Sequence, residues 1–494
     1  MSNYPLALAI AVLPESILAG IAAICAVLAL LRPRQRPDLF RWVACIGLAG
    51  AIAAAGFALY GMRTNSDGVG LVVWGGGLSV DRFSMFITIA ACSFALITCL
   101  LSDTYLRVNP RRAGAFFVLV LLATAATSAL ASEHEMVTFF VAFETLVVCL
   151  TAIPALVKTD HRVAEASLKY VLESGLASAT LLYGLAILYG VTGSTDLGAV
   201  AGALGRAPAP AALGVALVVL ALTFGLGIFP LRQWMTRTAE ATHATVAGFV
   251  VTIGVTAGAV GVVRVGVGGL GGAVRPWTGL ATAVVAIALT YIALLALREQ
   301  RVSRLIAIVA GGQAAMLLLA ALGFAGAQAG TPAAGTIALL FAIVIFGLAT
   351  LAAFAFLAMF QTAGIGDTRE EFHGLAHRSP PSALLFAIGL VTLVGVPPLA
   401  GFIARVLIVD SAIQAGYGWL AVVALAAMVV LAVPVIRLVG AMYGDAGGEV
   451  PFTVTATPRL ARMTAAFCCL GAFYLAVLAQ PLLTAARAGA GSLH

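Results

Sequence analysis

Five ionisable side chains stand in or beside long apolar runs of the sequence: Glu144, Lys169, Glu173, His243 and Arg405. A charge is costly in such surroundings unless it is paired or functional. Carboxylate, lysine and histidine side chains can gain and lose protons, and burial moves their pKa values toward neutrality. Arginine, by contrast, keeps its proton. These residue types predict a path for proton transfer, with Arg405 as a charge that does not move.

Glu144 lies in the stretch FFVAFETLVVCL, far from either end of its apolar run. Burial would raise its pKa and let it exchange a proton near neutral pH. The alternative is a structural ion pair with a neighbouring helix.

Lys169 and Glu173 in SLKYVLESG are one helical turn apart, so they share a helix face and are expected to pair. Lys169 can also extend toward the membrane surface. Lys158 and Lys169 are the only lysines in the chain, and the other basic residues are arginines.

Four polar side chains, of which His243 is named above, are placed by their position in the apolar runs. His243 begins one run and could serve proton entry or simply lie at the membrane interface. Arg264 and Arg437 come at the ends of runs and are expected to extend to the interface. Gln313 falls inside a run and needs a hydrogen-bonding neighbour.

The composition predicts an all-α membrane protein. The chain has 494 residues, of which 62% are hydrophobic and 10% are charged, whereas a soluble protein carries roughly a quarter of its residues as charges. Runs long enough to cross a bilayer core of about 30 Å recur from end to end. They give about fourteen expected transmembrane helices, at 7–31, 41–62, 84–102, 116–131, 136–156, 168–191, 211–230, 244–263, 278–297, 305–325, 335–358, 383–406, 418–440 and 464–483.

The basic residues predict the orientation. If the segments after odd-numbered spans are cytoplasmic, they hold about eighteen Arg or Lys against about six on the other side. Both termini are therefore expected on the extracytoplasmic side of a bacterial cell membrane. The first span is long and has no basic residue before it, which argues against a cleavable signal. The net charge of +7 then reflects this bias and not binding of nucleic acid.

No sequence pattern predicts a cofactor or a metal. The seven cysteines are scattered through apolar runs without metal-ligand spacing, which is typical of small core residues. No phosphate-binding glycine motif follows a strand and opens a helix. The chain is therefore expected to have no catalytic centre of its own, and redox or nucleotide chemistry is expected in partner subunits.

Two blocks of five predicted spans resemble one another. Residues 111–265 (helices 4–8) and 275–445 (helices 9–13) each contain a span interrupted by proline, at Pro230 in FGLGIFPLRQW and at Pro397 and Pro398 in VGVPPLAGF. This pattern predicts an inverted repeat around a site near the bilayer midplane. Residues 1–110 form helices 1–3 before the repeats, and residues 460–494 form a fourteenth helix after them.

Seven strings together resemble the antiporter-like subunits of respiratory complex I, most closely the subunit N branch of NADH–quinone oxidoreductases. They span residues 79–405: SVDRFSMF, the FET around Glu144, EASLKYVL, LYGVTGSTDL, PLRQW, EEFHGLAHRSP and VGVPPLAGFIAR. The resemblance implies fourteen helices, two inverted repeats each with a broken helix, and a central line of charged residues driven by quinone reduction elsewhere in the complex. It also implies that other membrane subunits are the partners and that they alone bind quinone and NADH.

Carried over by position, Glu144 matches the glutamate of the fifth helix, Lys169 the lysine that opens the sixth, and Arg405 the lysine of the twelfth. The pattern then departs from the family. Gly225 and Val255 stand where the family has lysines, and Gln313 stands where a histidine is usual.

These departures predict an impaired proton relay. The break at Pro230 is expected to leave room and free carbonyls for a lysine at position 225, so Gly225→Lys is expected to restore part of the relay. Three alternatives stay open: a subunit of a multi-subunit cation/proton antiporter, a subunit of a membrane-bound hydrogenase, and a non-conducting scaffold.

The charge bias yields a testable topology. Single cysteines introduced into segments 32–41 and 298–304 are expected to resist an impermeant thiol reagent in whole cells, because both segments are predicted to be cytoplasmic. Labelling of either cysteine from outside would overturn the predicted orientation.

Overall fold

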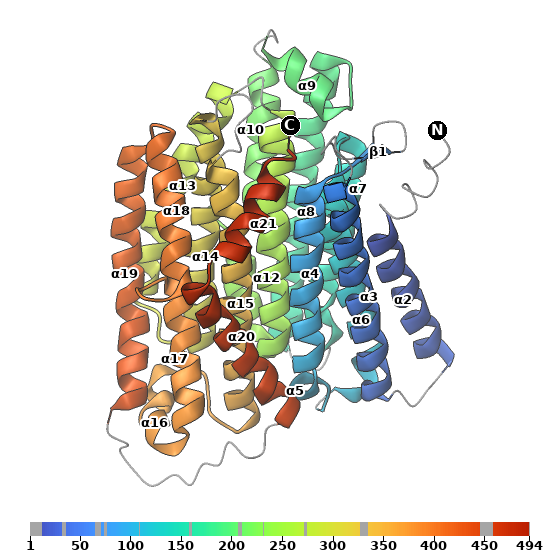
Figure 1. Ribbon diagram of the computed structural model, residues 1–494. Helices are drawn as coiled ribbons and strands as arrows, with labels where there is room; N and C mark the ends of the chain where they lie inside the picture. The colour runs from blue at the N-terminus through green and yellow to red at the C-terminus, as the bar shows by residue number, and fades with distance from the viewer. Residues whose placement is uncertain are drawn as a thin grey trace.

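The protein is a bundle of long helices that run roughly side by side (Figure 1). The computed structural model describes residues 12–493 apart from 32–35, 65–70, 74–76, 108, 158–160, 206–209, 231, 271–273, 327–333 and 445–457. Part of the first predicted cytoplasmic segment, and Lys158, lie outside the described residues.

The first half of the chain holds the following elements: α2 (Leu13–Leu31), α3 (Pro37–Thr64), β1 (Leu71–Val73), β2 (Leu78–Val80), α4 (Arg82–Leu101), α5 (Asp103–Leu106), η2 (Pro110–Arg112), α6 (Ala113–Ser132), α7 (Met136–Ala152), η3 (Pro154–Leu156), α8 (His161–Thr192), α9 (Leu197–Leu204), α10 (Pro210–Gly225), α11 (Gln233–Ala241), α12 (Ala244–Gly261) and the π-helical turn η4 (Val262–Gly269). β1 and β2 form an antiparallel hairpin in which Leu71 faces Val80.

The second half holds α13 (Val274–Ala296), α14 (Val302–Leu322), η6 (Gly323–Gly326), α15 (Ala334–Thr362), η7 (Arg369–Phe372), α16 (Leu375–Arg378), α17 (Pro380–Val394), α18 (Ala400–Gln414), α19 (Gly418–Tyr443), α20 (Arg459–Val477) and α21 (Gln480–Ala490).

The all-helical membrane fold is confirmed. Within the described residues, 11 helices are long and apolar enough to cross a membrane, and α7, α10 and α17 are shorter apolar helices. All of them lie at the predicted spans. The exact number of crossings and the inverted repeat stay predictions.

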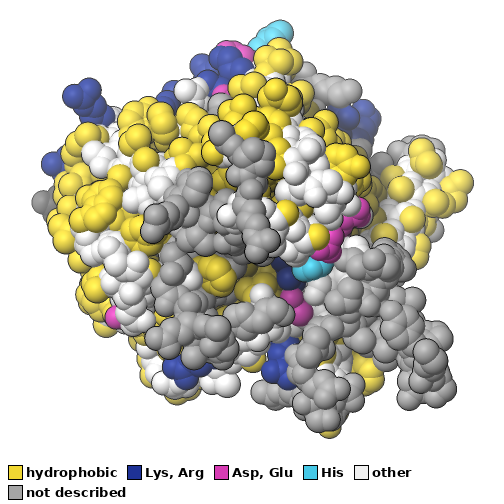
Figure 2. Space-filling model, turned by 90° about the horizontal axis from the view of Figure 1, so that it is seen from above, with side chains coloured by type: hydrophobic (Ala, Val, Ile, Leu, Met, Phe, Trp, Pro, Cys, Tyr) yellow, Lys and Arg dark blue, Asp and Glu magenta, His cyan; other side chains and the backbone are white. Residues whose placement is uncertain are grey.

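The helices differ in how deeply they are packed. In the most apolar stretch of α12 every residue is buried, and in α14 and α15 most are, whereas fewer than half are buried in α2, α8 and α20. Figure 2 shows hydrophobic side chains over much of the outside and charged side chains in separate small groups. Leu172, Val429 and Phe467 are each about two-thirds exposed or more, as expected for side chains that meet lipid or a neighbouring subunit.

Three predicted spans differ in detail from the structure. The span at 211–230 ends early, at Gly225, and the chain resumes a helix only at α11. The span at 383–406 is two helices, because Gly395 at φ +78° ends α17 before the double proline. The last span is likewise two helices, since Pro481 sits in the first turn of α21; proline fits there because the missing N–H would be unpaired in any case.

α20 and α21 run obliquely across the outside of the bundle (Figure 1) and pack on both α15 and α4. They therefore connect the second half of the chain to the N-terminal helices. α4 and α15 also meet directly, where Gly347 leaves space for the ring of Phe94.

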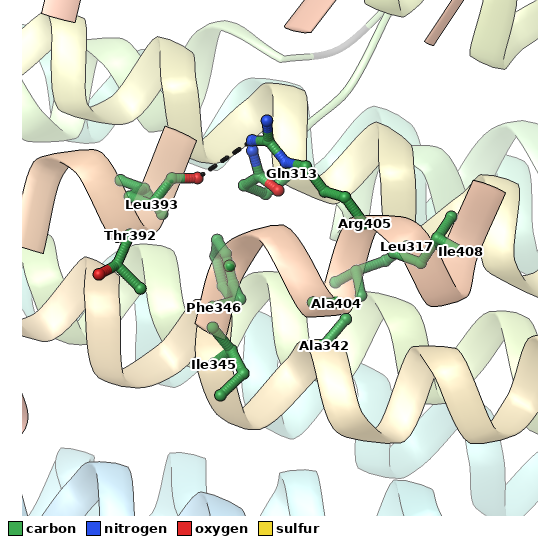
Figure 3. A pocket seen from close by; sticks show the side chains of 11 residues that line it. Gln313, Leu317, Ala342, Ile345, Phe346, Thr392, Leu393, Ala404, Arg405 and Ile408 are labelled. Atoms are coloured by element: carbon green, nitrogen blue, oxygen red, sulfur yellow. Dashed lines mark hydrogen bonds between the residues drawn. The ribbon is translucent and has the colours of Figure 1, made fainter. Parts of the chain in front are cut away.

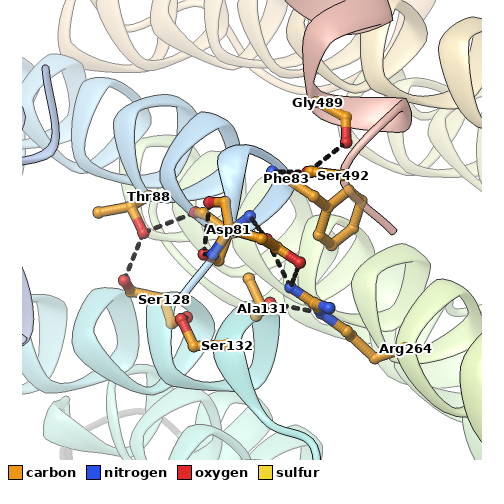
Figure 4. Close-up of polar contacts among 10 residues, drawn as sticks. Asp81, Phe83, Thr88, Ser128, Ala131, Ser132, Arg264, Gly489 and Ser492 are labelled. Carbon is orange, nitrogen blue, oxygen red and sulfur yellow. Dashed lines mark hydrogen bonds and ion pairs between the residues drawn. The ribbon is translucent and has the colours of Figure 1, made fainter. Parts of the chain in front are cut away.

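A buried ion pair joins three segments of the chain (Figure 4). The Arg264 guanidinium in η4 donates through Nη2 to Asp81 Oδ1 at 2.8 Å and Oδ2 at 2.7 Å, and through Nε to the Ala131 carbonyl at 2.5 Å. Asp81 also caps α4, since its carboxylate accepts from the Ser84 amide at 2.7 Å. The guanidinium lies 4.9 Å from the centre of the Phe83 ring. The prediction that Arg264 extends to the interface is wrong, because a carboxylate at the start of α4 holds it inside.

Arg264→Met is expected to destabilise the protein by about 3–5 kcal/mol, because it leaves the Asp81 carboxylate buried without a counter-charge. The fraction of complex that stays assembled on heating measures this. Arg107→Met is the control, since its pair with Asp103 at 3.4 Å is half-exposed and is worth about 0–1 kcal/mol. The double variant Asp81→Asn/Arg264→Met is expected to recover part of the loss. Equal behaviour of the two single variants would show that the buried pair does not stabilise the fold.

Candidate functional site

Glu144 lies on a face of α7 that turns away from the bundle. Its neighbours Val141 and Val148 are 58% and 59% exposed, while Glu144 itself is half-buried. Glu144 Oε1 has no hydrogen-bond partner among the described residues. Oε1 is itself buried, so the exposed valines on either side of Glu144 are what this face offers to a neighbouring molecule in the membrane.

The expected pair between Lys169 and Glu173 is not formed. Lys169 pairs with Glu165, one turn earlier on α8, and both side chains are exposed. Glu173 pairs instead with Arg237 of α11. The same-helix prediction is wrong because α11, the helix after the break, places a guanidinium against α8.

Arg237 belongs to a charged cluster that the sequence analysis did not single out. Glu240, also in α11, pairs with Arg301 at 2.7 Å and with Arg304 at 3.4 Å. Arg304 pairs in turn with Glu299 at 3.1 Å. The cluster borders a pocket of about 240 Å³ between α8, α11 and the segment before α14. The charges in TRTAE and REQR were the available signal, but their pairing depends on how α11 folds back.

The break after α10 is closed by packing. A Cβ atom on Gly225 would lie 3.1 Å from the Gly258 Cα, and one on Gly258 would lie 2.4 Å from the Gly225 carbonyl carbon. α10 and α12 therefore touch backbone to backbone. Val255, one turn before Gly258, is fully buried in α12.

The carbonyl left free at the end of α10 is already used. Trp234 in α11 donates from Nε1 to the Phe224 oxygen at 3.0 Å, and its indole stacks on Tyr170 of α8 with ring centres 5.1 Å apart. The room expected for a lysine at position 225 is thus narrow, because a Cβ atom there lies close to Gly258, and one of the expected free carbonyls, that of Phe224, is occupied. The second glycine, Gly258, lets the helices close over that space.

Arg405 in α18 faces the second break (Figure 3). It is 6% exposed, and its Nη2 donates to the Leu393 carbonyl at 3.4 Å, near the end of α17. Gln313 of α14 lines the same small cavity. The structure thus brings Arg405 and Gln313 together, and it does so at the break made by Pro397 and Pro398.

His243 is the residue that caps α12. Its Nδ1 accepts from the Thr245 amide at 3.3 Å, and its ring centre lies 5.8 Å from that of Tyr105. Burial lowers the pKa of His243 to about 4, so the imidazole is neutral near pH 7. The expectation that it titrates in the physiological range is wrong.

Glu133, just after α6, is a titratable group that the sequence analysis missed. It is 5% exposed, and burial raises its pKa to about 7, more than the Thr138 hydroxyl and the Arg264 guanidinium lower it. Asp367, between α15 and η7, also has a raised pKa through burial, although it accepts from the Ser303 amide at 2.8 Å. Both lie in segments between helices, where no sequence pattern indicated burial.

Among the described residues, no group of three or more His, Cys, Asp or Glu side chains could hold a metal ion. Fold and site together define a multi-helix membrane protein whose two interrupted helices meet buried polar groups.

Residues 133–430 match the family described as NADH:quinone oxidoreductase/Mrp antiporter, TM, and the chain belongs to this family. NADH-quinone oxidoreductase subunit N of Moorella thermoacetica is 29% identical over 419 residues, which cover 84% of each chain. A chain of respiratory complex I from Thermus thermophilus has a TM-score of 0.79 at 27% identity and covers 95% of this chain and 98% of its own length.

A chain of the membrane-bound sulfane sulfur reductase, an archaeal respiratory complex, has a TM-score of 0.85 at 22% identity over 98% of both chains. At this identity the likeness concerns the fold alone.

Gly258→Ala is expected to destabilise the assembled protein by about 1–3 kcal/mol or more, because the added methyl meets backbone that cannot rotate away. Gly225→Lys is expected to reduce assembly and not to restore a relay. The control is Gly175→Ala in α8, where no atom lies within 4 Å of the added methyl. Complex yield and thermal midpoint are the measurements. Normal yield of Gly258→Ala would mean that α10 and α12 can separate.

Proposed function

We propose that this chain is a membrane subunit of a proton-translocating NADH–quinone oxidoreductase of the complex I type, similar to subunit N. The family match, the relatives named subunit N and the complex I chain of like fold support this assignment. In this role the subunit binds no redox cofactor, and partner subunits bind quinone and NADH.

We further propose that proton transfer through this subunit is impaired. The contact between Gly225 and Gly258 carries this proposal. It leaves little space for a long side chain at position 225, where the resemblance places a lysine, and Arg405 keeps its charge. In the extreme case the subunit transfers no protons at all, and it is then a non-conducting scaffold.

The outward face of α7 supports the proposal that neighbouring membrane subunits are the partners. Val137, Val141 and Val148 are each more than half exposed, and Glu144 lies between the last two. Glu144 is half-buried, and its Oε1 has no hydrogen-bond partner among the described residues; a cation stabilises such a carboxylate. A lysine or arginine on a helix of the adjoining subunit supplies one.

Two other assemblies remain alternatives because they share the fold: a cation/proton antiporter and a membrane-bound hydrogenase or related complex. Affinity purification of the tagged chain from its native membrane decides among them. Co-purified NADH–quinone reductase activity is the expected result. Co-purified antiporter or hydrogenase subunits without that activity would refute the assignment.

Glu144→Gln tests the impaired relay. Because Gly225 and Val255 carry no titratable side chain to receive a proton from Glu144, we expect the number of protons translocated per electron to equal that of wild type in reconstituted complex, with NADH–quinone reductase activity intact. Glu370→Gln is the control, because it makes the same carboxylate-to-amide change at an exposed residue of η7. A lower ratio in Glu144→Gln alone would show that protons pass through Glu144 by another route and would overturn the proposal.

A further inference from the structure

Arg405 is a buried cation without a carboxylate partner among the described residues. Its one hydrogen bond, to the Leu393 carbonyl, is long at 3.4 Å, and its Nε has no partner. A guanidinium presents several N–H donors and no acceptor. An unpaired charge is strongly destabilising away from water, so the fold has to supply Arg405 with a further acceptor.

A second donor without a partner faces the same place. Gln313 Nε2 has no hydrogen-bond partner in the described chain, and Gln313 and Arg405 both line a cavity of about 20 Å³. Figure 3 shows the Gln313 amide beside the guanidinium. A cavity holds one water-sized particle when its volume exceeds roughly 10–15 Å³, so this one holds a single particle of that order.

The walls of the cavity decide what kind of particle fits. Leu317, Phe346 and Ile408 contribute apolar surface, and the Thr392 hydroxyl already donates to the Ile388 carbonyl at 2.7 Å. A water molecule would bring two hydrogens that need acceptors of their own, whereas an anion needs donors only. The Gln313 Oε1 and the Thr392 Oγ1 could accept from a water molecule, but they do not neutralise the Arg405 charge. The positive charge and the two donors without partners therefore favour an anion.

The helix ends beside the cavity also favour an anion. Gly401 and Ala404, in the first turns of α18, line it, and the N-terminal end of a helix carries partial positive charge. The negative end of α17 is also near, but its Leu393 carbonyl accepts from Arg405 and so faces the cation.

We propose that Arg405 and Gln313 bind one small monovalent anion of the halide class, which serves as the counter-ion of Arg405 at the break between α17 and α18. Both side chains are departures from the lysine and histidine expected here by resemblance, and together they replace two groups that titrate by two that do not. The site does not depend on whether the subunit conducts protons, because occupancy and proton translocation are measured separately.

Bromide reports on the site directly. Crystals of the complex are prepared with bromide in place of chloride and measured at the bromine absorption edge. One anomalous peak is expected in the cavity between the Arg405 Nε and the Gln313 Nε2. Solution binding is measured in parallel as the rise in thermal midpoint of the complex on titration with chloride at constant ionic strength, balanced by gluconate, which is too large for the cavity.

Gln313→Leu is expected to remove one donor, abolish the bromide peak and weaken the halide effect by about tenfold. The matched control is Gln414→Leu, because Gln414 is an exposed glutamine on the same helix as Arg405. This variant is expected to keep the bromide peak and the halide effect. Arg405→Met is expected to lose both as well, and Gln313→Leu carries the test if that variant does not assemble.

Three results would overturn the proposal. They are wild-type density in the cavity without an anomalous peak, which means water; equal thermal midpoints in chloride and gluconate; and a bromide peak that persists unchanged in Gln313→Leu. The number of protons translocated per electron is measured separately and does not affect this test. Failure of the proposed function and failure of the anion site are therefore distinguishable.

Discussion

The constraint on which this structure depends is that polar groups inside a bilayer find their partners within the protein. Lipid offers no hydrogen bonds, so an interrupted helix exposes carbonyls that something in the chain has to satisfy. Trp234 does this at the end of α10, and Arg405 does it near the end of α17. The two breaks thus differ in chemistry, because a neutral indole closes the first and a permanent cation faces the second.

The closure of the first break determines what the middle of the bundle can do. Gly225 and Gly258 allow α10 and α12 to meet backbone to backbone, and small residues at helix contacts are a common way to gain packing in membranes. The same contact excludes a long side chain at that point. Tight packing and a lysine-based relay are therefore alternatives at this position, and the two glycines favour packing.

The sequence was sufficient for the fold class and for the apolar helices, because length and hydropathy alone define a span. It also located both breaks near their prolines, although proline alone does not end a helix here: α10 already ends at Gly225, Gly395 ends α17, and Pro434 lies inside α19. The sequence was not sufficient to predict which charged side chains form ion pairs. Lys169 and Glu173 have the right spacing to pair, yet Arg237 takes Glu173 because α11 folds back on α8, and Arg264 is held inside by Asp81, which lies far away in the sequence. Long-range contacts of this kind leave no local pattern.

Titratable charges and permanent charges lie in different parts of the bundle. Glu133, whose pKa burial raises to about 7, and Asp367, whose pKa burial also raises, lie in segments between helices. Arg405 is a fixed charge within the bundle, and α12 at its centre is entirely buried. A group with a pKa near neutrality changes charge with small changes in pH or in nearby charge, whereas arginine does not. The groups whose pKa values burial raises thus lie between helices, whereas the fixed cation lies inside the bundle and can act on them only through its field and through the packing that holds it.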